Sequence, residues 1–253
     1  MGLRMNLEDL RVIVEQERDP YKNLSIEEAI LISVALGKAS ATLRLWINRR
    51  SLILGSGVGL GSVNLALCEK LGIPLVRRFS GGGLVYHDEG NLNWSFIAKH
   101  SSKDIIAAYE YVGGLIASSL RAFKICADFV RPNRIDVHGK KLSGMAGRLY
   151  QGTILIHGTL LVNSDLELLN RLCPLPPHSP PVVSLKEVLG HELAMEDVIK
   201  AIISSLEARG IRMKMGGLTP DEAELSRELY DKKYSSLAWN LGFDYPIIPG
   251  VKP

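Results

Sequence analysis

The sequence predicts an α+β fold, in which a mixed β-sheet is flanked by helices. The chain has 253 residues, of which 46% are hydrophobic and 23% charged, and this is the composition of a globular protein with a sizeable core. Apolar and polar side chains alternate in several segments between residues 42 and 162, as in half-buried strands. Strand and helix patterns do not alternate regularly, which disfavours a parallel sheet built from βαβ units.

The N-terminal part is predicted to contain one helix and then strands. Residues 24–37 predict a helix, because Ser25 and Glu28 have the spacing of a capping box. Residues 42–54 alternate in the manner of two successive strands. A glycine-rich loop, residues 55–61, follows them.

The middle of the chain predicts most of the sheet and one long helix. Residues 75–79 and 91–98 are strand-like, and residues 102–123 place apolar side chains at helical spacing. Residues 135–162 predict strands joined by two glycine turns. The turns are His138-Gly139 and Gln151-Gly152.

The last third of the chain is predicted to be helical. A helix begins near Ser164 and Glu167, which again have capping-box spacing, and a proline-rich loop occupies residues 174–181. Two further helices are expected over residues 195–209 and 220–234. We therefore expect one domain over residues 1–253, with residues 182–253 as its helical C-terminal part.

Composition and the N-terminus exclude several classes of protein. A net charge of +3 is too small to indicate a nucleic-acid partner. The three cysteines are scattered, which disfavours a disulfide framework or a zinc site. The sequence shows no signal peptide and no apolar run of membrane-spanning length, so we expect a cytoplasmic protein that does not bind membranes.

A triple glycine is the first candidate for a ligand site. Gly81, Gly82 and Gly83 carry no side chains, so their backbone N–H groups can turn toward an anion, and Arg78 adds a positive charge suited to phosphate. The earlier loop at residues 55–61 has neither dinucleotide nor P-loop spacing. A flexible hairpin loop without a ligand stays an open alternative for the triple glycine.

Two adjacent lysines are the second candidate. Lys140 and Lys141 follow the predicted turn, and in a strand they point to opposite faces. One of them can then face a site and neutralise a carboxylate and a phosphate as they react, whereas the alternative is two solvated lysines. His157 lies in an apolar strand, where a histidine is more often part of the core.

Four ordered stretches resemble the lipoate–protein ligase A family. The first, residues 77–96, resembles the family's signature, and the second, residues 139–147, resembles the motif that holds its catalytic lysine. Residues 157–169 resemble a third stretch, and residues 228–242 resemble the end of the archaeal catalytic subunit. Together they span about residues 20–242.

This resemblance implies the shared catalytic fold of biotin and lipoate ligases and two half-reactions. Lipoate and ATP, with Mg²⁺ expected, form lipoyl-AMP, and a lysine of a lipoyl carrier domain then takes the lipoyl group. The carrier is an E2 subunit or a glycine-cleavage H protein. By motif position, the catalytic residue is Lys141, and His87, Asn133 and His157 are further candidates. The residues expected to bind ATP and lipoyl-AMP are Arg78, Gly81, Gly82, Gly83, Leu84, Val85, Tyr86 and Lys141.

Two departures from the family pattern shape further expectations. Arg134 occupies a position that is usually aspartate, unless Asp136 takes its place. The resemblance also leaves no room for the C-terminal accessory domain of long bacterial ligases, so we expect a possible separate accessory subunit.

Three rival functions are weighed against a ligase. An ATP-independent octanoyl- or lipoyltransferase needs a nucleophilic cysteine. Ile154 occupies the position of that cysteine in one transferase type, and Cys126 is a weak match to the other. The second rival, a non-catalytic lipoyl-binding protein, is disfavoured by Lys141. A biotin ligase fits the triple-glycine signature less well.

Overall fold

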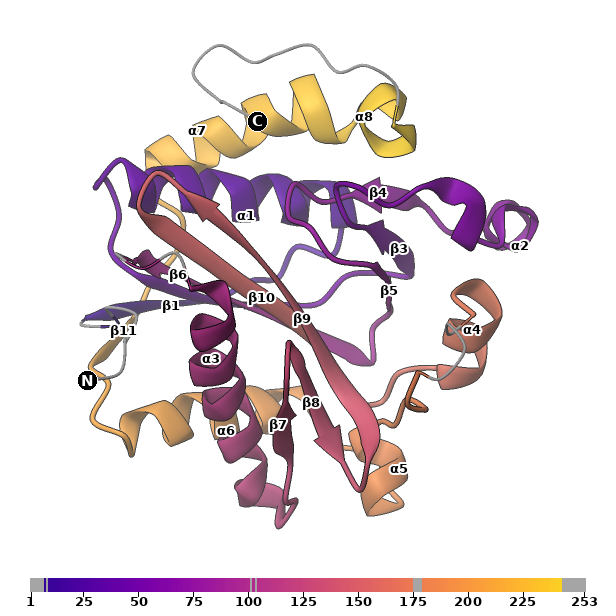
Figure 1. The fold of residues 1–253 in the computed structure, drawn as a ribbon. Coiled ribbons are helices and arrows are strands. Elements are labelled where there is room, and N and C mark those ends of the chain that lie inside the picture. The colour runs from indigo at the N-terminus through magenta and orange to yellow at the C-terminus, as the bar shows by residue number, and fades with distance from the viewer. Residues whose placement is uncertain (1–6, 8, 101, 103, 175–178, 243–253) are drawn as a thin grey trace.

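An eight-stranded mixed sheet forms the centre of the molecule, as predicted (Figure 1). The computed structural model describes residues 7, 9–100, 102, 104–174 and 179–242. In their order across the sheet, the strands are Met213–Met215 (β11), Leu10–Val14 (β1), Thr42–Trp46 (β2), Asn91–Lys99 (β6), Thr153–Leu161 (β10), Lys140–Tyr150 (β9), Arg134–Val137 (β8) and Asp128–Val130 (β7). Parallel pairs occur where β1 meets β2 and β11, and the other pairs are antiparallel.

A second, three-stranded sheet carries the triple-glycine loop. Its strands are, in order, Leu75–Arg77 (β4), Ser51–Leu54 (β3) and Leu84–His87 (β5). The strand β3 pairs parallel with β4 and antiparallel with β5, so the loop between β4 and β5 lies at one end of this sheet. Figure 1 shows the small sheet beside helix α1, at one end of the large sheet.

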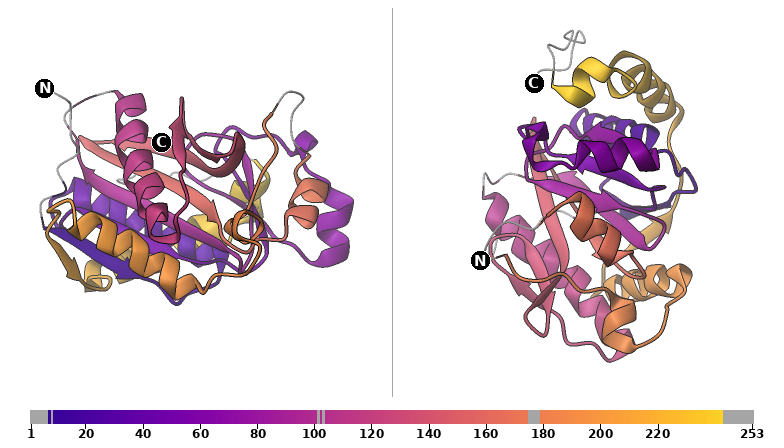
Figure 2. Two further views of the ribbon diagram at one scale, coloured as in Figure 1. Left: turned by 90° about the horizontal axis from the view of Figure 1, so that it is seen from below. Right: turned by 90° about the vertical axis from the view of Figure 1, so that its right-hand side faces the viewer.

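Helices cover both faces of the large sheet. The helices α1 (Pro20–Ala35) and α7 (Pro220–Leu229) lie on one side, and α3 (Ile105–Ser119) and α6 (Met195–Glu207) lie on the other (Figure 2). The shorter helices are α2 (Leu65–Leu71), α4 (Leu166–Leu172), α5 (Leu185–Leu189) and α8 (Leu237–Leu241), with short 3₁₀ segments at Leu60–Ser62 and Leu120–Phe123 and a π turn at Tyr230–Tyr234. No helix in the described part of the chain is long and apolar enough to span a membrane.

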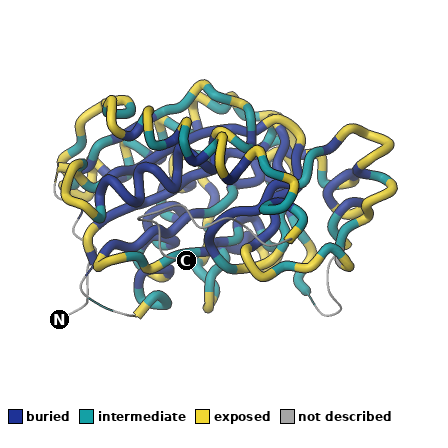
Figure 3. Tube along the Cα trace, turned by 90° about the horizontal axis from the view of Figure 1, so that it is seen from above, coloured by how far each residue is buried: buried dark blue, intermediate teal, exposed yellow. Residues whose placement is uncertain are grey.

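The alternation along β6 is confirmed, but both of its faces are buried. Figure 3 shows that buried residues gather in the middle of the molecule, with exposed residues around its periphery. The apolar residues Leu92, Trp94 and Phe96 belong to the core cluster that includes α3 and α6. Asn93 and Ser95 on the opposite face have exposed fractions of only 1% and 0%. Helix α1 and the small sheet cover this polar face. The alternation therefore separates an apolar buried face from a polar buried face, rather than core from solvent.

Two predicted N-cap residues are wrong, and for α1 the predicted start of the helix is wrong as well. Helix α1 begins at Pro20 with Asp19 as its N-cap, because the Asp19 carboxylate accepts bonds from the N–H groups of Tyr21 and Lys22. Helix α4 is capped by Asp165 rather than by Ser164. In each case an aspartate closer to the true start accepts the free N–H groups more directly.

The turns of the long antiparallel segment are confirmed. His138, Gly139, Gln151 and Gly152 all have positive φ, as tight hairpin turns require. The helices predicted over residues 195–209 and 220–234 are present as α6 and α7, and β11 adds a strand to the edge of the large sheet. Residues 243–253 of the predicted C-terminal part lie outside the described residues. The strands β1, β5 and β11 were not predicted.

Candidate active site

Two adjoining cavities lie on the α1 side of the large sheet, against the small sheet. The inner cavity has a volume of about 140 Å³, and the outer cavity has a volume of about 520 Å³. The residues that line both are Gly83, Leu84, Val85, Asn133, Lys141, Gly144 and Thr159. The cavities therefore share one wall, which is built from the triple-glycine loop and from strands β9 and β10.

Hydrogen bonds from the buried Arg78 side chain hold the triple-glycine loop in place. This guanidinium is 4% exposed, and it donates to the carbonyls of Gly81 (2.8 Å) and Gly83 (2.9 Å) and to that of Ile53 (3.3 Å). Burial lowers the pKa of Arg78 to about 10, so the group stays charged at neutral pH. Gly82 has a φ of +88°, which a side chain would disfavour. The loop shape is thus set before any ligand binds.

The predicted loop residues divide into two sets. Gly83, Leu84 and Val85 line both cavities, and Tyr86 lines the outer one. Gly81 and Gly82 line neither cavity, and they form the turn that presents the others. Arg78 lines the inner cavity, while its guanidinium donates hydrogen bonds to Ser80, Gly81, Ile53 and Gly83. A nucleotide contact by Arg78 stays a prediction.

Lys141 lies where the two cavities meet. Lys140 is exposed and Lys141 is half-buried, so the prediction that they point to opposite faces is confirmed. A Cβ placed on Gly144 would lie 3.0 Å from the Lys141 Nζ, so the lysine extends over that glycine. The backbone of Lys141 is fixed by bonds to Pro181 and Val183. Burial, followed by the nearby Arg134 charge, lowers the pKa of Lys141 below that of an ordinary lysine.

The described lining of both cavities contains cations but no carboxylate. Arg134 lines the outer cavity, and its Nε donates to both oxygens of Asp136 at 3.0 and 3.1 Å. That pair leaves Asp136 neutralised by an arginine. No group of three or more possible metal-binding His, Cys, Asp or Glu residues occurs among the described residues. An anion is therefore the kind of ligand that this site suits.

A chain of buried hydrogen bonds orients His157. Its Nδ1 lies 2.9 Å from the carboxylate of Glu27 on α1, and its Nε2 lies 2.7 Å from the Ser80 hydroxyl. Arg78 Nε also donates to that hydroxyl, at 3.1 Å. Ser80 is fully buried, so the arrangement braces the glycine loop against α1 and β10 rather than exposing a nucleophile.

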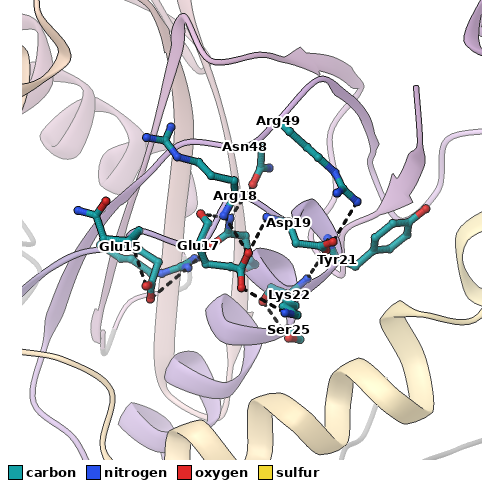
Figure 4. Close-up of polar contacts among 12 residues, drawn as sticks. Glu15, Glu17, Arg18, Asp19, Tyr21, Lys22, Ser25, Asn48 and Arg49 are labelled. Carbon is teal, nitrogen blue, oxygen red and sulfur yellow. Dashed lines mark hydrogen bonds and ion pairs between the residues drawn. The ribbon is translucent and has the colours of Figure 1, made fainter. Parts of the chain in front are cut away.

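A second chain orients His87. Asn23 donates to the Asn48 side-chain oxygen at 2.8 Å, and the Asn48 amide contacts His87 Nδ1 at 2.9 Å. The loop that carries Asn48 is tied to the segment before α1, where Arg49 contacts Asp19 at 3.0 Å (Figure 4). Burial lowers the pKa of His87 to about 3, so its ring is neutral at neutral pH.

The cysteines are poorly placed for nucleophilic catalysis. Cys126 is exposed and lines neither cavity, and it lies before strand β7, which begins at Asp128. Cys173 lines the outer cavity, but burial raises the pKa of its thiol to about 12. Cys68 is buried, and its pKa is also raised. At neutral pH each buried thiol is protonated and a weak nucleophile.

Sequence reasoning missed several cavity residues. Leu24, Trp46 and Asn93 line the inner cavity, and Ser143 lines the outer one. The polar face of β6 was a usable signal for Asn93, because the strand at the end of the signature stretch alternates asparagine and serine with large apolar residues. Its meaning depends on what covers that face, which alternation alone does not reveal.

Comparison with known sequences points to one family. The sequence model of the lipoyl protein ligase A/B catalytic domain matches residues 19–207. The lipoate-protein ligase A subunit 1 of Thermoplasma acidophilum is 30% identical, over 93% of this chain and 97% of the relative. Octanoyltransferase LipM of Brevibacillus brevis is 26% identical, over 93% of this chain and 99% of the relative. With the probable lipoate-protein ligase A of Mycoplasma pneumoniae, the match covers only 46% of the relative.

Solved structures share the fold over nearly the whole chain. A bipartite archaeal lipoate protein ligase from Thermoplasma acidophilum, described with its E2 lipoyl domain, has a TM-score of 0.85 at 28% identity, and covers 95% of this chain and 99% of that one. A structure from the same organism with bound lipoic acid gives 0.83 at 29% identity, covering 93% and 100%. A lipoate-protein ligase A bound with ATP gives 0.86 at 30% identity, covering 92% and 99%.

Proposed function

The chain belongs to the lipoyl protein ligase A/B catalytic-domain family, and from this premise we propose that it joins a lipoyl group to a lysine of a carrier domain through lipoyl-AMP. Structures of relatives contain ATP in one case and lipoic acid in another. The relatives over nearly full length include an archaeal ligase subunit. An ATP-dependent ligase is the function that these matches support.

One observation carries the proposal: a half-buried lysine stands at the junction of a small cavity and a larger one. The inner cavity includes Leu24, Ile53 and Met145, which suit an aliphatic acyl chain. The outer cavity is wider and includes Arg134, which suits a nucleotide and its phosphates. With the substrates so placed, the carboxylate and the α-phosphate meet at Lys141.

This placement matches the charge changes in both half-reactions. In the first, a lipoate oxygen attacks the α-phosphorus of ATP, and the bond to pyrophosphate breaks. In the second, a carrier lysine nitrogen attacks the acyl carbon, the bond to AMP breaks, and the amine loses a proton. A cation at Lys141 lowers the repulsion between carboxylate and phosphate, and then stabilises negative charge that develops on the acyl and phosphate oxygens. The N–H groups near Gly83 add fixed dipoles on the same side.

Magnesium enters this scheme with ATP, as part of the substrate. The described residues of the two cavities provide no carboxylate ligand for a protein-held ion. Asp136, which pairs with the cavity residue Arg134, is in neither lining, and both of its oxygens accept from the Arg134 Nε. We therefore assign no step to a metal bound by the protein.

The acceptor is proposed to be a lipoyl carrier domain. The archaeal relative of similar length was described as a bipartite ligase together with its E2 lipoyl domain. An E2 lipoyl domain is accordingly the first acceptor to try, and a glycine-cleavage H protein is the second. A relative from the same organism is named lipoate-protein ligase A subunit 1, which supports a separate accessory subunit here.

The transferase alternative has one specific observation in its favour, which is the full-length similarity to an octanoyltransferase. Against it, Cys126 is exposed and lies outside both cavities, and Ile154 is buried in β10. A non-catalytic binding protein has no need for a desolvated lysine between two cavities, and Lys141 is present.

The test is incubation of the chain with lipoate, MgATP and an apo lipoyl domain, with and without a matching accessory subunit, followed by intact-mass analysis of both proteins. We expect one lipoyl group on the carrier, only when ATP is present, and the same result with Cys126→Ser. A hydroxylamine-sensitive acyl adduct on Cys126, with transfer from an acyl donor in the absence of ATP, would establish the transferase instead.

A further inference from the structure

One face of helix α1 begins two buried hydrogen-bond chains that lead to the inner cavity. Asn23 and Glu27 are four residues apart, so their side chains lie on the same face of the helix, and both are fully buried. The chain from Asn23 reaches His87 through Asn48. The chain from Glu27 reaches His157 directly. Both histidines line the inner cavity, and the partner of one ring nitrogen decides which nitrogen of a neutral histidine carries the proton.

The direction of the first chain is fixed by Arg44. Burial lowers the pKa of Arg44 to about 10, so the guanidinium stays charged at neutral pH and can only donate. It donates to the side-chain oxygen of Asn23, so the Asn23 nitrogen is the donor to the Asn48 oxygen, at 2.8 Å. The Asn48 nitrogen in turn faces His87 Nδ1 at 2.9 Å, and it can only donate. His87 Nδ1 is therefore an acceptor, and the ring proton lies on Nε2.

The direction of the second chain is fixed at both of its ends. Arg78 Nε can only donate, and it donates to the Ser80 hydroxyl at 3.1 Å. Ser80 is fully buried, and His157 Nε2, at 2.7 Å, is the partner among the described residues that can accept its hydroxyl hydrogen. The Glu27 carboxylate can only accept, so it takes a hydrogen bond from Nδ1 of the same ring, at 2.9 Å. His157 thus carries its proton on Nδ1, in the opposite sense to His87.

The second chain ends on the triple-glycine loop. The Arg78 guanidinium donates to the carbonyls of Gly81 and Gly83, at 2.8 and 2.9 Å. Gly83 lines both cavities, so the chain that starts at Glu27 connects helix α1 to the wall that the cavities share. Both ring nitrogens of His157 are used by bonds within the protein. The ring therefore holds the loop, and neither nitrogen is left to take a proton from a substrate.

We propose that Asn23 and Glu27 are positioning residues that hold the two cavity histidines in opposite tautomers, and that Glu27 acts through His157 to keep the glycine loop in its reactive shape. The inference rests on the proposed function and adds to it two residues outside the lining of both cavities. Reversal of either ring proton would set two donors or two acceptors against each other inside the protein, where an unmade hydrogen bond is costly.

The tautomers can be observed in the whole protein without any substrate, after labelling of the histidines with ¹⁵N. Protonated and unprotonated ring nitrogens give clearly separate signals in long-range ¹H–¹⁵N spectra. We expect a protonated Nε2 in His87 and a protonated Nδ1 in His157, and the variants His87→Gln and His157→Gln assign the signals by removing them. The other tautomer in either ring, or a doubly protonated His157 at neutral pH, would overturn the proposal.

Two nearly isosteric variants interrupt one chain each, and each is the control for the other. Asn48→Asp keeps the oxygen that accepts from Asn23 but replaces the donor that faces His87, so Nδ1 of His87 should become protonated. Glu27→Gln replaces a group that can only accept by one that can also donate, so His157 should show a mixture of tautomers. Each change should leave the signals of the other histidine in place. Unmoved signals in both variants, or movement of both histidines in each, would contradict two separate chains.

Transfer from preformed lipoyl-AMP to an apo lipoyl domain reports how the second chain affects the glycine loop. Glu27→Gln and Ser80→Ala should each slow single-turnover transfer by about tenfold, the effect of one buried hydrogen bond to a charged group. The double variant should be scarcely slower than either single variant, because both changes interrupt the same chain. Ser33→Ala is the matched control, since Ser33 is also buried on α1 but lines neither cavity, and it should transfer at the wild-type rate.

The outcomes separate this inference from the proposed function. Losses that multiply to about 100-fold in the folded double variant would overturn the action of Glu27 through His157 and leave the ligase proposal standing. Failure of the folded wild type to transfer would overturn the proposed function and the part of this inference that concerns the loop, whereas the nitrogen signals alone decide the tautomers. Circular dichroism and thermal melting establish that each variant is folded.

Discussion

At the scale of single residues, the position of Lys141 organises the account. The sequence predicted that Lys140 and Lys141 point apart, as neighbours in a strand do, and Lys140 is exposed while Lys141 is half-buried, although the pairing of β8 with β9 shifts register beside Lys141. It could not reveal the two cavities, since their walls come from residues as distant in sequence as Leu24 and Thr159. Local periodicity therefore predicts which way a side chain points, whereas what lies beyond it depends on long-range packing.

Lys141→Ala should lose most adenylation and transfer activity, at least about 100-fold, because the charge at the junction of the cavities disappears. Lys140→Ala is the matched control, since Lys140 is exposed on the other face of the same strand. Its activity should stay within about twofold of the wild type, as expected for a surface change. Single-turnover assays of both half-reactions make the comparison. Near-normal rates for Lys141→Ala would remove this lysine from the mechanism.

The lowered pKa of Lys141 predicts a loss of ligand affinity at alkaline pH. The ammonium form binds the adenylate, and this form is lost as the pH rises through a pKa below that of an ordinary lysine. Titration of a non-hydrolysable lipoyl-adenylate mimic at increasing pH should show this decline. In Lys141→Arg the group stays charged, so the same decline should be absent. A decline of equal size in both proteins would assign the titration to another group.

Gly83 and Gly82 should respond differently to substitution. A Cβ on Gly83 meets no protein atom within 4 Å, although the residue lines both cavities, so Gly83→Val should fold and bind the adenylate mimic more than tenfold more weakly. A Cβ on Gly82 would lie 2.8 Å from the Arg78 guanidinium, and the Gly82 backbone has a φ of +88°, which a side chain disfavours. Gly82→Val should therefore mainly lower stability. Calorimetric titration and thermal melting separate the two effects. Unchanged affinity in Gly83→Val would contradict the contact between loop and ligand.

At the scale of secondary-structure elements, the C-terminal helices are attached to the site by buried polar contacts. Lys233 donates to both oxygens of Glu28 at 2.8 Å, and Trp239 donates to the carbonyl of Arg77 at 2.8 Å. Arg77 in turn donates to the carbonyls of Gly55 and Val58, at 3.0 and 2.8 Å. The C-terminal segment therefore holds the glycine-rich loop at the edge of the outer cavity.

Removing the buried charge of Glu28 should be costly. Glu28→Gln leaves Lys233 buried with an incomplete partner, and the expected loss of stability is about 3 kcal/mol. Glu228→Gln is the control, because that residue pairs with Lys232 on the surface, and it should change stability by less than about 0.5 kcal/mol. Urea unfolding measures both. Equal stability of the two variants would show that the buried pair does not anchor these helices.

Element prediction from the sequence succeeded where periodicity extended over many residues and failed where it was short. The long hairpins of β9 and β10 and the helices α3, α6 and α7 were predicted close to their observed positions. The short strands β1 and β11 were missed, because they are recognisable only through their parallel pairing with each other and with β2. The early start of α1 was missed because Asp19 and Pro20 were not considered as its cap and first turn.

At the scale of the whole molecule, the open question is whether adenylation needs a partner. The archaeal relative that matches this chain over nearly its full length is one subunit of a bipartite ligase. A partner that closes over the outer cavity would exclude water from the acyl-phosphate bond and order the phosphates beside Arg134 and Lys141. Both cations line that cavity in this chain.

We therefore predict that this chain releases pyrophosphate from ATP and lipoate slowly by itself, and at least about tenfold faster when a matching accessory subunit is added. A coupled pyrophosphate assay measures the effect, with the accessory subunit alone as the control. Full adenylation by this chain alone, without any gain from the added subunit, would show that no partner is needed.

The most direct test of the central claim is single-turnover transfer from preformed lipoyl-AMP to an apo lipoyl domain, followed by the intact mass of the carrier. This assay omits ATP activation, so it depends only on the cavities and on Lys141. The account predicts that the wild-type chain adds one lipoyl group to the carrier, and that Lys141→Ala, although folded, does so far more slowly. Absence of transfer by the folded wild-type chain, or equal transfer by both proteins, would contradict it.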